Sequence, residues 1–146
     1  FKLDTEGSDK RYAFCLPASD PACPRLAVAE SPIDALSLAT LEKRTGGPWQ
    51  NCHYLSLGGT APNALLQFLR DHPAVSQISL CLDNDKAGLA GMDRLEQAVQ
   101  SDPALAAQVT LLCRNPSPVE YGKDYNEFLA ALVRMARGQQ RGREAR

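Results

Sequence analysis

Short apolar runs alternate with longer amphipathic stretches along most of the chain. The runs at residues 26–29, 53–57, 78–82 and 109–113 have the length and composition of buried strands. Between them, residues 32–43, 61–70 and 87–100 place apolar side chains at helical spacing, and a last helix is predicted from Asp124 to about Arg137. Because strands that alternate with helices form right-handed crossovers, the pattern predicts an α/β fold with a parallel sheet of about four strands and helices on both faces.

The two ends of the chain differ from this central pattern. Residues 1–24 are polar and Pro-rich, and the run 11–16 alternates enough to predict a short edge strand. We therefore divide the chain into a lead-in segment (1–24), one domain (25–137) and a flexible basic tail (138–146). Residues 134–146 carry five Arg and one Glu, a local charge of +4. The chain opens with Phe1 rather than Met, so we expect it to be a piece of a longer polypeptide.

Composition narrows the class of protein. The chain has 146 residues, of which 44% are hydrophobic and 23% charged, as expected for one globular domain. A formal net charge of -1 gives no overall attraction to nucleic acid, so any such attraction must be local. No stretch approaches the roughly 20 apolar residues that span a bilayer, and the first residues do not resemble a secretory signal. We expect a cytoplasmic protein with no membrane partner.

Cysteine and histidine usage offers little chemistry. The five cysteines are odd in number and irregularly spaced, without a C-x-x-C pair, which argues against a disulfide framework and a structural zinc site. Cys81 and Cys113 lie in apolar runs and are predicted to be buried. His53 and His72 are expected at surface or turn positions, and we assign them no role.

Acidic residues follow two of the predicted strands, and a glycine turn follows another. Glu30 comes after the first strand, Gly58-Gly59-Thr60 after the second, and Asp83-Asn84-Asp85 after the third. The carboxyl ends of parallel strands meet at one edge of a sheet, so these groups are expected to converge there. Carboxylates held close together repel unless a cation lies between them, and the nearby cations are chiefly Lys86 and Lys123.

A hard divalent ion suits such a group of carboxylates. Mg²⁺ binds one or two protein carboxylates together with waters and phosphate oxygens, and Mn²⁺ can take its place. We predict a metal site made by Asp83 and Asp85 with Glu30 and Asp34. The amides of Gly58, Gly59 and Thr60 are candidates to hold a phosphate, together with Lys86.

Each of these motifs also has an ordinary structural explanation. The Asp83 to Asp85 segment can be a solvated turn, and the glycine turn can be a tight connection in which Thr60 caps the next helix. Asp34 follows Ser31-Pro32 in a good helix start, and Asp124 with Glu127 forms a capping box. Both aspartates can therefore be helix caps, metal ligands or both.

Taken in order, the motifs resemble those of the Toprim domain, which occurs in bacterial primases, topoisomerases and OLD-type nucleases. The matching segments are Glu30 with Asp34-Ala35-Leu36, then Leu57-Gly58-Gly59-Thr60, then Asp83-Asn84-Asp85-Lys86-Ala87-Gly88, and finally Lys123-Asp124-Tyr125-Asn126-Glu127. The last is similar to the K-D-x-N-[DE] element of primase-like members. The resemblance covers about residues 25–135.

This resemblance carries expectations about structure and chemistry. It implies a Rossmann-like sheet, Mg²⁺ bound by Asp83 and Asp85, and Glu30 as general acid or base in forming or cleaving a phosphodiester. Lys123 is the second catalytic candidate. Members with this ending are often primase-like proteins of plasmids and mobile elements, in which a zinc-binding domain lies upstream. The implied partners are nucleic acid, nucleotides and the other domains of a longer protein.

Three functions remain open at this point. The first is Mg²⁺-dependent nucleotidyl transfer or phosphodiester chemistry in a primase-like protein. The second is a non-catalytic module that keeps the metal site to hold nucleic-acid phosphates, although such a module has no need of the proton carrier Glu30. The third is a phosphatase of the haloacid dehalogenase type, which also places D-x-D after an apolar strand. Tyr125 is expected to pack at the start of the last helix and not to act as a topoisomerase nucleophile.

Overall fold

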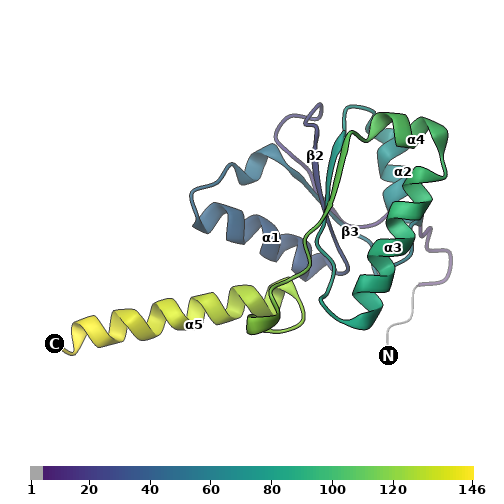
Figure 1. Cartoon of the computed structure of the whole chain (residues 1–146). Coiled ribbons are helices and arrows are strands. Elements are labelled where there is room, and N and C mark those ends of the chain that lie inside the picture. The colour runs from purple at the N-terminus through teal and green to yellow at the C-terminus, as the bar shows by residue number, and fades with distance from the viewer. Residues whose placement is uncertain (1–4) are drawn as a thin grey trace.

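A five-stranded sheet organises the chain (Figure 1). The computed structural model describes residues 5–146. The strands are β1 (Cys15–Leu16), β2 (Arg25–Ala29), β3 (His53–Ser56), β4 (Gln77–Leu80) and β5 (Leu111–Arg114). Their spatial order is β1-β3-β2-β4-β5, with β2 to β5 parallel and β1 antiparallel to β3. The sheet is therefore mostly parallel, and the predicted edge strand is present as a two-residue strand.

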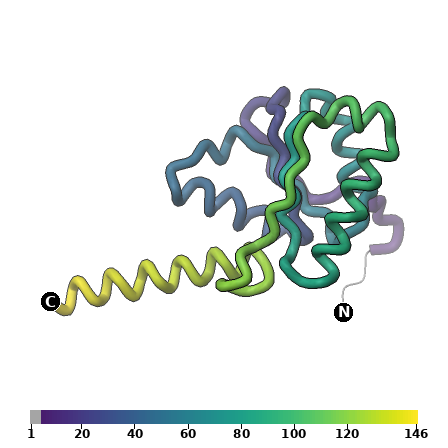
Figure 2. The backbone as a smooth tube through the Cα atoms, in the orientation of Figure 1, coloured from purple at the N-terminus to yellow at the C-terminus, as the bar shows by residue number. Residues whose placement is uncertain are grey.

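Helices cover both faces of the sheet. They are α1 (Pro32–Arg44), α2 (Asn63–Asp71), α3 (Lys86–Gln100), α4 (Pro103–Gln108) and α5 (Tyr125–Glu144), with 3-10 turns η1 (Trp49–Asn51) and η2 (Val119–Tyr121). Helices α2, α3 and α4 lie on one face, and α1 lies on the other beside the start of α5 (Figure 1, Figure 2). The α/β fold expected from the sequence is thus confirmed.

Alternating side chains on the strands build two cores of unequal size. Leu26 and Val28 of β2 point toward α2 and α3 and join the larger core, while Ala27 and Ala29 point toward α1. Residues of the larger core are mostly leucines, valines and other large aliphatic side chains, whereas small side chains such as Ala35 and Ala39 dominate the α1 face. The small residues let α1 lie close to the sheet.

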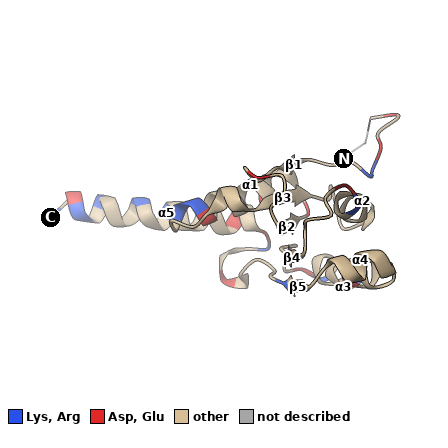
Figure 3. Cartoon of the chain, turned by 90° about the horizontal axis from the view of Figure 1, so that it is seen from above, with Lys and Arg blue, Asp and Glu red and all other residues tan. Residues whose placement is uncertain are grey.

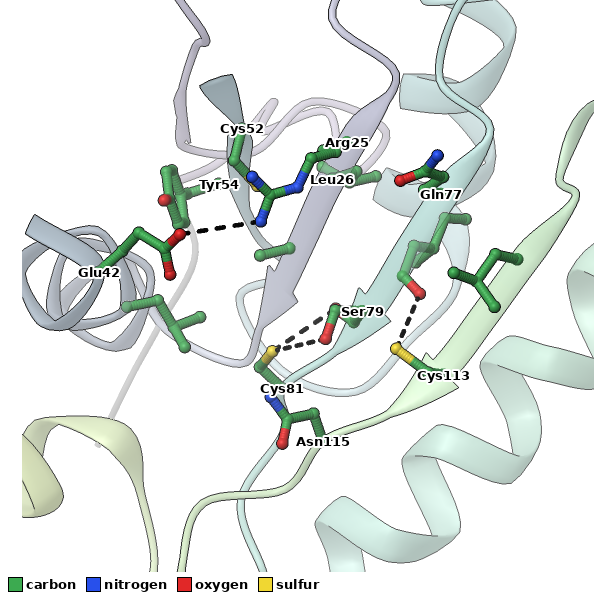
Figure 4. Close-up of a pocket in the computed structure, with 14 residues that line it drawn as sticks. Arg25, Leu26, Glu42, Cys52, Tyr54, Gln77, Ser79, Cys81, Cys113 and Asn115 are labelled. Atoms are coloured by element: carbon green, nitrogen blue, oxygen red, sulfur yellow. Dashed lines mark hydrogen bonds and ion pairs between the residues drawn. The ribbon is translucent and has the colours of Figure 1, made fainter. Parts of the chain in front are cut away.

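The helix α1 covers the sheet only in part. Beside it lies an open cavity of about 310 Å³ over β2, β4 and β5, which Figure 4 shows in close-up. The Arg25 guanidinium reaches Glu42 of α1 at 3.9 Å across its margin, and the apolar side chain of Leu111 is 55% exposed. The prediction that Cys113 is buried was wrong, because no helix within residues 5–146 covers this part of β5, whereas Cys81 is buried as expected.

The histidine assignment from sequence was wrong for His53. Its side chain is 1% exposed, because β3 lies second from the edge of the sheet and begins beneath the N-terminal segment. The Nδ1 atom of His53 accepts a hydrogen bond from the amide of Ala18 at 3.0 Å. All five cysteines are free thiols in the described chain.

Several element boundaries differ from the sequence-based ones. The last strand begins at Leu111 instead of residue 109, because the unpredicted helix α4 occupies the segment before it. Asp102 starts α4 by accepting hydrogen bonds from the amides of Ala104 and Leu105. The last helix, α5, continues to Glu144 through most of the segment expected to be a flexible tail. The first four residues of the expected lead-in segment lie outside the described residues.

Within residues 5–146, none of the helices has the length and apolar character needed to cross a membrane.

The turn from β4 into α3 is closed by a near contact at Gly88. A Cβ atom at this position would collide with the backbone carbonyl of Asp83 and would lie 3.0 Å from Glu30 Oε1. Glycine is therefore required for the start of α3 to lie against the strand ends. In contrast, a Cβ atom at Gly138 in α5 would have no neighbour within 4 Å.

We expect Gly88→Ala to lower the free energy of unfolding by about 1–3 kcal/mol, since the added methyl group forces the Asp83 loop to shift. Gly138→Ala is the matched control in a helix without neighbours, and it should be neutral or stabilising by about 0.5–1 kcal/mol. Urea unfolding of both variants measures the difference. Equal stability of the two variants would show that the close approach at Gly88 does not constrain the loop.

Candidate active site

The candidate site lies where the chain reverses its direction across the sheet. From β2 the chain passes through α1 to β3 on one side, and later returns to β4 on the other side of β2. Such a switch point leaves a crevice beyond the carboxyl ends of the two central strands, where ligands of open parallel sheets bind. Glu30 follows β2 and Asp83 follows β4, so these two side chains stand on either side of the switch point.

Glu30 and Asp83 are in direct contact. The Oε1 atom of Glu30 accepts a hydrogen bond from the amide of Asp83 at 3.3 Å. Burial and the neighbouring Asp83 carboxylate raise the pKa of Glu30 to about 7, and the hydrogen bond offsets only part of this effect. Burial and the charge of Asp34 raise the pKa of Asp83, which is 7% exposed. Glu30 can therefore hold or release a proton near neutral pH.

Lys123 places a positive charge between the two aspartates of the loop. Its Nζ atom lies 3.5 Å from Asp83 Oδ2 and 3.9 Å from Asp85 Oδ2. Both carboxylates raise the pKa of Lys123, which therefore stays charged. The other oxygen of Asp85, Oδ1, accepts from the amide of Gly88 at 2.8 Å and caps α3. The helix cap and the charge pair thus use different oxygens of Asp85.

Asn84 fixes the segment that carries Lys123. Its side-chain amide donates to the carbonyls of Ser117 and Gly122, both at 2.8 Å, and its backbone amide donates to the carbonyl of Lys123 at 2.9 Å. The buried Ser117 hydroxyl donates to the same Lys123 carbonyl at 2.6 Å. Gly122 precedes Lys123 with φ 125°, a conformation that favours glycine.

Sequence reasoning missed this role of Asn84 and Ser117. Asn84 lies between the two aspartates of the D-N-D segment, and no role for it follows from the sequence. A polar side chain enclosed in a motif of this kind was the available signal, although the chain pattern alone does not show which loop it reaches.

Asp34 links α1 to α5. Its Oδ2 atom lies 2.5 Å from the Ser31 hydroxyl, and its Oδ1 atom accepts from the amide of Asn126 at 3.1 Å. Ser31 caps α1 by accepting from the amide of Asp34, as the sequence indicated. Both carboxylate oxygens of Asp34 therefore form hydrogen bonds within the fold. The negative charge of Asp34 also raises the pKa of Asp83.

The glycine turn after β3 uses its amides within the fold. The Gly59 amide donates to the carbonyl of Glu30 at 3.0 Å, and the Gly58 amide donates to the Ser56 hydroxyl at 3.3 Å. The hydroxyl of Thr60 accepts from Arg94 at 2.8 Å and does not cap α2, whose N-cap residue is Pro62. The structure thus ties this turn to Glu30. Lys86 is the exposed first residue of α3.

The start of α5 is capped as the sequence predicted. Asp124 accepts from the amide of Glu127 at 2.8 Å, and Glu127 in turn accepts from the amide of Lys123 at 2.6 Å. Tyr125 is buried, and its hydroxyl donates to the carbonyl of Asn115 at 2.8 Å. Tyr125 therefore packs at the start of the last helix, which confirms the sequence-based interpretation.

The donor set at the switch point suits a hard cation. In the described part of the chain, no group of three or more His, Cys, Asp or Glu side chains is close enough to hold a metal ion by itself. Asp83 and Asp85 nevertheless present two carboxylate oxygens to one cationic group, the ammonium of Lys123. An ion that binds few protein carboxylates and several waters, as Mg²⁺ does, fits this pair, with Glu30 adjacent.

The chain is similar to known proteins over most of its length. A family model described as Toprim-like matches residues 27–129. The uncharacterized protein pXO2-78 of Bacillus anthracis is 29% identical over 152 aligned positions, which cover 99% of this chain and 42% of that protein. The chain therefore spans less than half the length of this relative. No solved structure matches the chain.

The stability of the metal-free chain should depend on the protonation of Glu30. Its pKa rises from 4.5 to about 7 on folding, so the free energy of unfolding should decrease as the pH rises through this interval. Glu30→Gln has no charge to lose, and we expect its stability to change less over the same interval. Urea unfolding in EDTA, from pH 4.5 to about pH 8, measures both slopes.

Asp83 also has a raised pKa, so part of the pH dependence should remain in Glu30→Gln. The exposed Glu120 provides a control, and Glu120→Gln should keep the slope of the parent. Identical slopes in the parent and Glu30→Gln would contradict the assignment.

Proposed function

Because the chain belongs to the Toprim-like family, whose domains generally bind divalent metal ions and act in nucleic-acid metabolism, we propose that it performs Mg²⁺-dependent phosphodiester chemistry on nucleic acid. The chemistry is the formation or cleavage of a phosphodiester bond, carried out as the Toprim module of a primase-like protein of a mobile element. The family assignment also separates the chain from the haloacid dehalogenase-type phosphatases considered from sequence.

The observation that carries the proposal is the contact between Glu30 and Asp83 at the switch point. A half-buried carboxyl group beside a carboxylate loop is placed to exchange a proton next to a bound cation. In this proposal Glu30 takes a proton from the attacking oxygen or gives one to the departing oxygen of the phosphodiester. Gly59 supports this role, because its amide holds the backbone carbonyl of Glu30.

Asp83 and Asp85 are the proposed metal ligands. When bound, Mg²⁺ supplies charge neutralisation and polarisation at the phosphate oxygens. Asp85 can accept this role without losing the cap of α3, since the two functions use different oxygens. The Lys123 side chain is 58% exposed, so its ammonium can turn toward a phosphate oxygen of the substrate while Asn84 and Ser117 hold its backbone.

The second candidate is a non-catalytic module that binds metal and nucleic-acid phosphates. It needs Asp83, Asp85 and Lys123 in the same places, but it gives no role to Glu30. Glu30 is the more informative residue, because burying a carboxyl group beside another carboxylate costs stability and a module that only binds phosphates gains nothing from it. We therefore favour the catalytic proposal.

The partners follow from the same proposal. We expect the substrates to be nucleic acid and nucleotides, with Lys86 and the segment from Gly58 to Thr60 facing them at the edge of the sheet. Because the relative pXO2-78 is much longer than the matched segment, further domains are expected to act with this one, among them the upstream zinc-binding domain implied by primase-like proteins. The domain is proposed to act in the cytoplasm.

Mg²⁺ should stabilise the parent chain and not Asp85→Asn. The gain in the free energy of unfolding follows RT ln(1 + [Mg²⁺]/Kd), about 2.7 kcal/mol at a hundred times Kd. Asparagine is a good helix cap, so Asp85→Asn keeps the start of α3 while it loses a ligand charge. Thermal melts with and without Mg²⁺ at matched ionic strength measure the gain.

Asp102→Asn is the control for this experiment. Asp102 also caps a helix, α4, but lies far along the chain from the proposed ligands, and the variant should keep the full gain from Mg²⁺. A parent chain indifferent to Mg²⁺ would remove the metal site from the proposal.

Glu30→Gln should lower turnover by about 10²–10⁴-fold and leave the stabilisation by Mg²⁺ in place, because it removes the proton carrier and keeps both metal ligands. The assays are primer synthesis from nucleoside triphosphates on single-stranded DNA and cleavage of a labelled oligonucleotide, each with Mg²⁺. Glu120→Gln serves as the control with unchanged turnover. Stabilisation by Mg²⁺ without any turnover by the parent would favour the non-catalytic module.

A further inference from the structure

The second half of α5 extends away from the rest of the molecule (Figure 2, Figure 3). We call residues 134–146 the basic arm. Every residue of the basic arm is exposed, whereas the preceding residues 128–133 are partly buried. Packing against the described fold therefore does not explain why this segment is helical. Its surface is free to contact a partner.

The basic arm carries a charge opposite to that of the body. It contains five arginines and one glutamate and has a charge of +4, while the whole chain has -1. Residues 1–133 therefore carry -5, and part of this negative charge lies at the acidic edge of the sheet, formed by Glu30, Asp83 and Asp85. A body of this charge repels a polyanion, so affinity for nucleic acid must come from a separate basic surface.

Three arginines of the basic arm lie on one side of the helix. Arg134, Arg137 and Arg141 are spaced by three and four residues, which places them in a stripe along α5. Among the described residues, none of these three arginines forms an ion pair. Arg143 lies on the opposite side of the helix, at 3.6 residues per turn.

Glycines flank one side of this stripe, while Gln140 and Glu144 lie with Arg137 and Arg141 on the other side. Gly138 and Gly142 lie beside it, and a Cβ atom at either position would have no neighbour within 4 Å. Two glycines in an exposed helix weaken it by about 1 kcal/mol each relative to alanine. Helix stability therefore does not explain why these two positions are glycine. The missing side chains do allow a partner molecule to approach the helix closely.

The stripe continues directly from the candidate active site. Lys123 lies two residues before α5, and the arginines follow at about 14–24 Å from Tyr125 along the helix, by a rise of 1.5 Å per residue. A single nucleic-acid strand that contacts both the stripe and the acidic edge must therefore span several nucleotides. Along the chain, Lys123 beside Asp83 and Asp85 is therefore followed by the three arginines of the stripe.

We propose that the basic arm binds the sugar-phosphate backbone of a nucleic acid through Arg134, Arg137 and Arg141 and holds the strand beside the acidic edge of the sheet. The contacts are charge-assisted hydrogen bonds from guanidinium groups to phosphate oxygens, which do not depend on base sequence. The inference rests on the proposed function for the choice of nucleic acid as the polyanion, and it makes the arm the main source of affinity.

The test compares two double variants that remove the same charge. Arg137→Gln/Arg141→Gln takes two members from the stripe, and Arg143→Gln/Arg146→Gln takes two arginines of the same arm from outside it. Binding of a fluorescent mixed-sequence oligonucleotide is measured by anisotropy in EDTA over a series of salt concentrations. Circular dichroism and thermal melts establish that both variants keep the fold.

We expect the slope of log K against log salt to fall by about 1.4–1.8 in the stripe variant, since each phosphate contact contributes about 0.7–0.9. The other variant should keep a slope near that of the parent. Equal reductions in the two variants would overturn the proposal, because they would show diffuse attraction with no stripe. Equally tight binding of polyglutamate or of anionic lipid vesicles at the same salt would overturn the choice of nucleic acid.

A third variant separates this inference from the proposed function. Glu30→Gln leaves the basic arm unchanged and should bind the oligonucleotide with the slope of the parent. If this variant and the parent bind alike but the parent shows no turnover, the proposed chemistry is wrong and the proposed binding by the basic arm is supported. If turnover is present but the stripe variant binds like the parent, the proposed binding by the basic arm is wrong and the proposed chemistry is supported.

Discussion

Repulsion among carboxylates at the switch point is the constraint on which the site depends. Glu30, Asp83 and Asp85 approach one another because their strands end side by side, and the fold must balance their charge to keep them there. The balance comes from Lys123, whose ammonium faces both aspartates. Asn84 holds the backbone of Lys123 from within the same loop that carries the negative charge. The loop thus positions its own counterion.

Local sequence patterns were enough to predict the sheet, the helices on both faces and the residues at the strand ends. Buried strands and amphipathic helices leave periodic signals, and the caps at Ser31 and Asp124 are read from a few consecutive residues. The extent of α5 was not predicted, because Gly138 and Gly142 disfavour a helix. No proline interrupts the segment, however, and the helix continues to Glu144.

Contacts between segments that are distant in the chain could not be predicted from the sequence. Asn84 reaches Ser117 and Gly122, which are 33 and 38 residues away, and Asp34 reaches Asn126 at a separation of 92 residues. No periodicity encodes such pairs. The sequence therefore identified the acidic residues of the site but not the groups that position Lys123, and it left Asp34 open between cap and ligand, where the structure shows a link between two helices.

The unequal cores on the two faces of the sheet bear on how the molecule moves. Asp83 and Asp85 belong to the loop between β4 and α3, which rests on the large aliphatic core, while Lys123 lies two residues before α5, whose first turn packs Tyr125 and Phe128 into the smaller core beside α1. Cooperative units with little buried apolar surface open at lower free energy than the rest of a protein. The layer formed by α1 and the start of α5 rests on the smaller of the two cores, and the segment that carries Lys123 leads into this layer. Opening of this layer would therefore move the Lys123 ammonium relative to the two aspartates, while the loop between β4 and α3 keeps its place on the larger core.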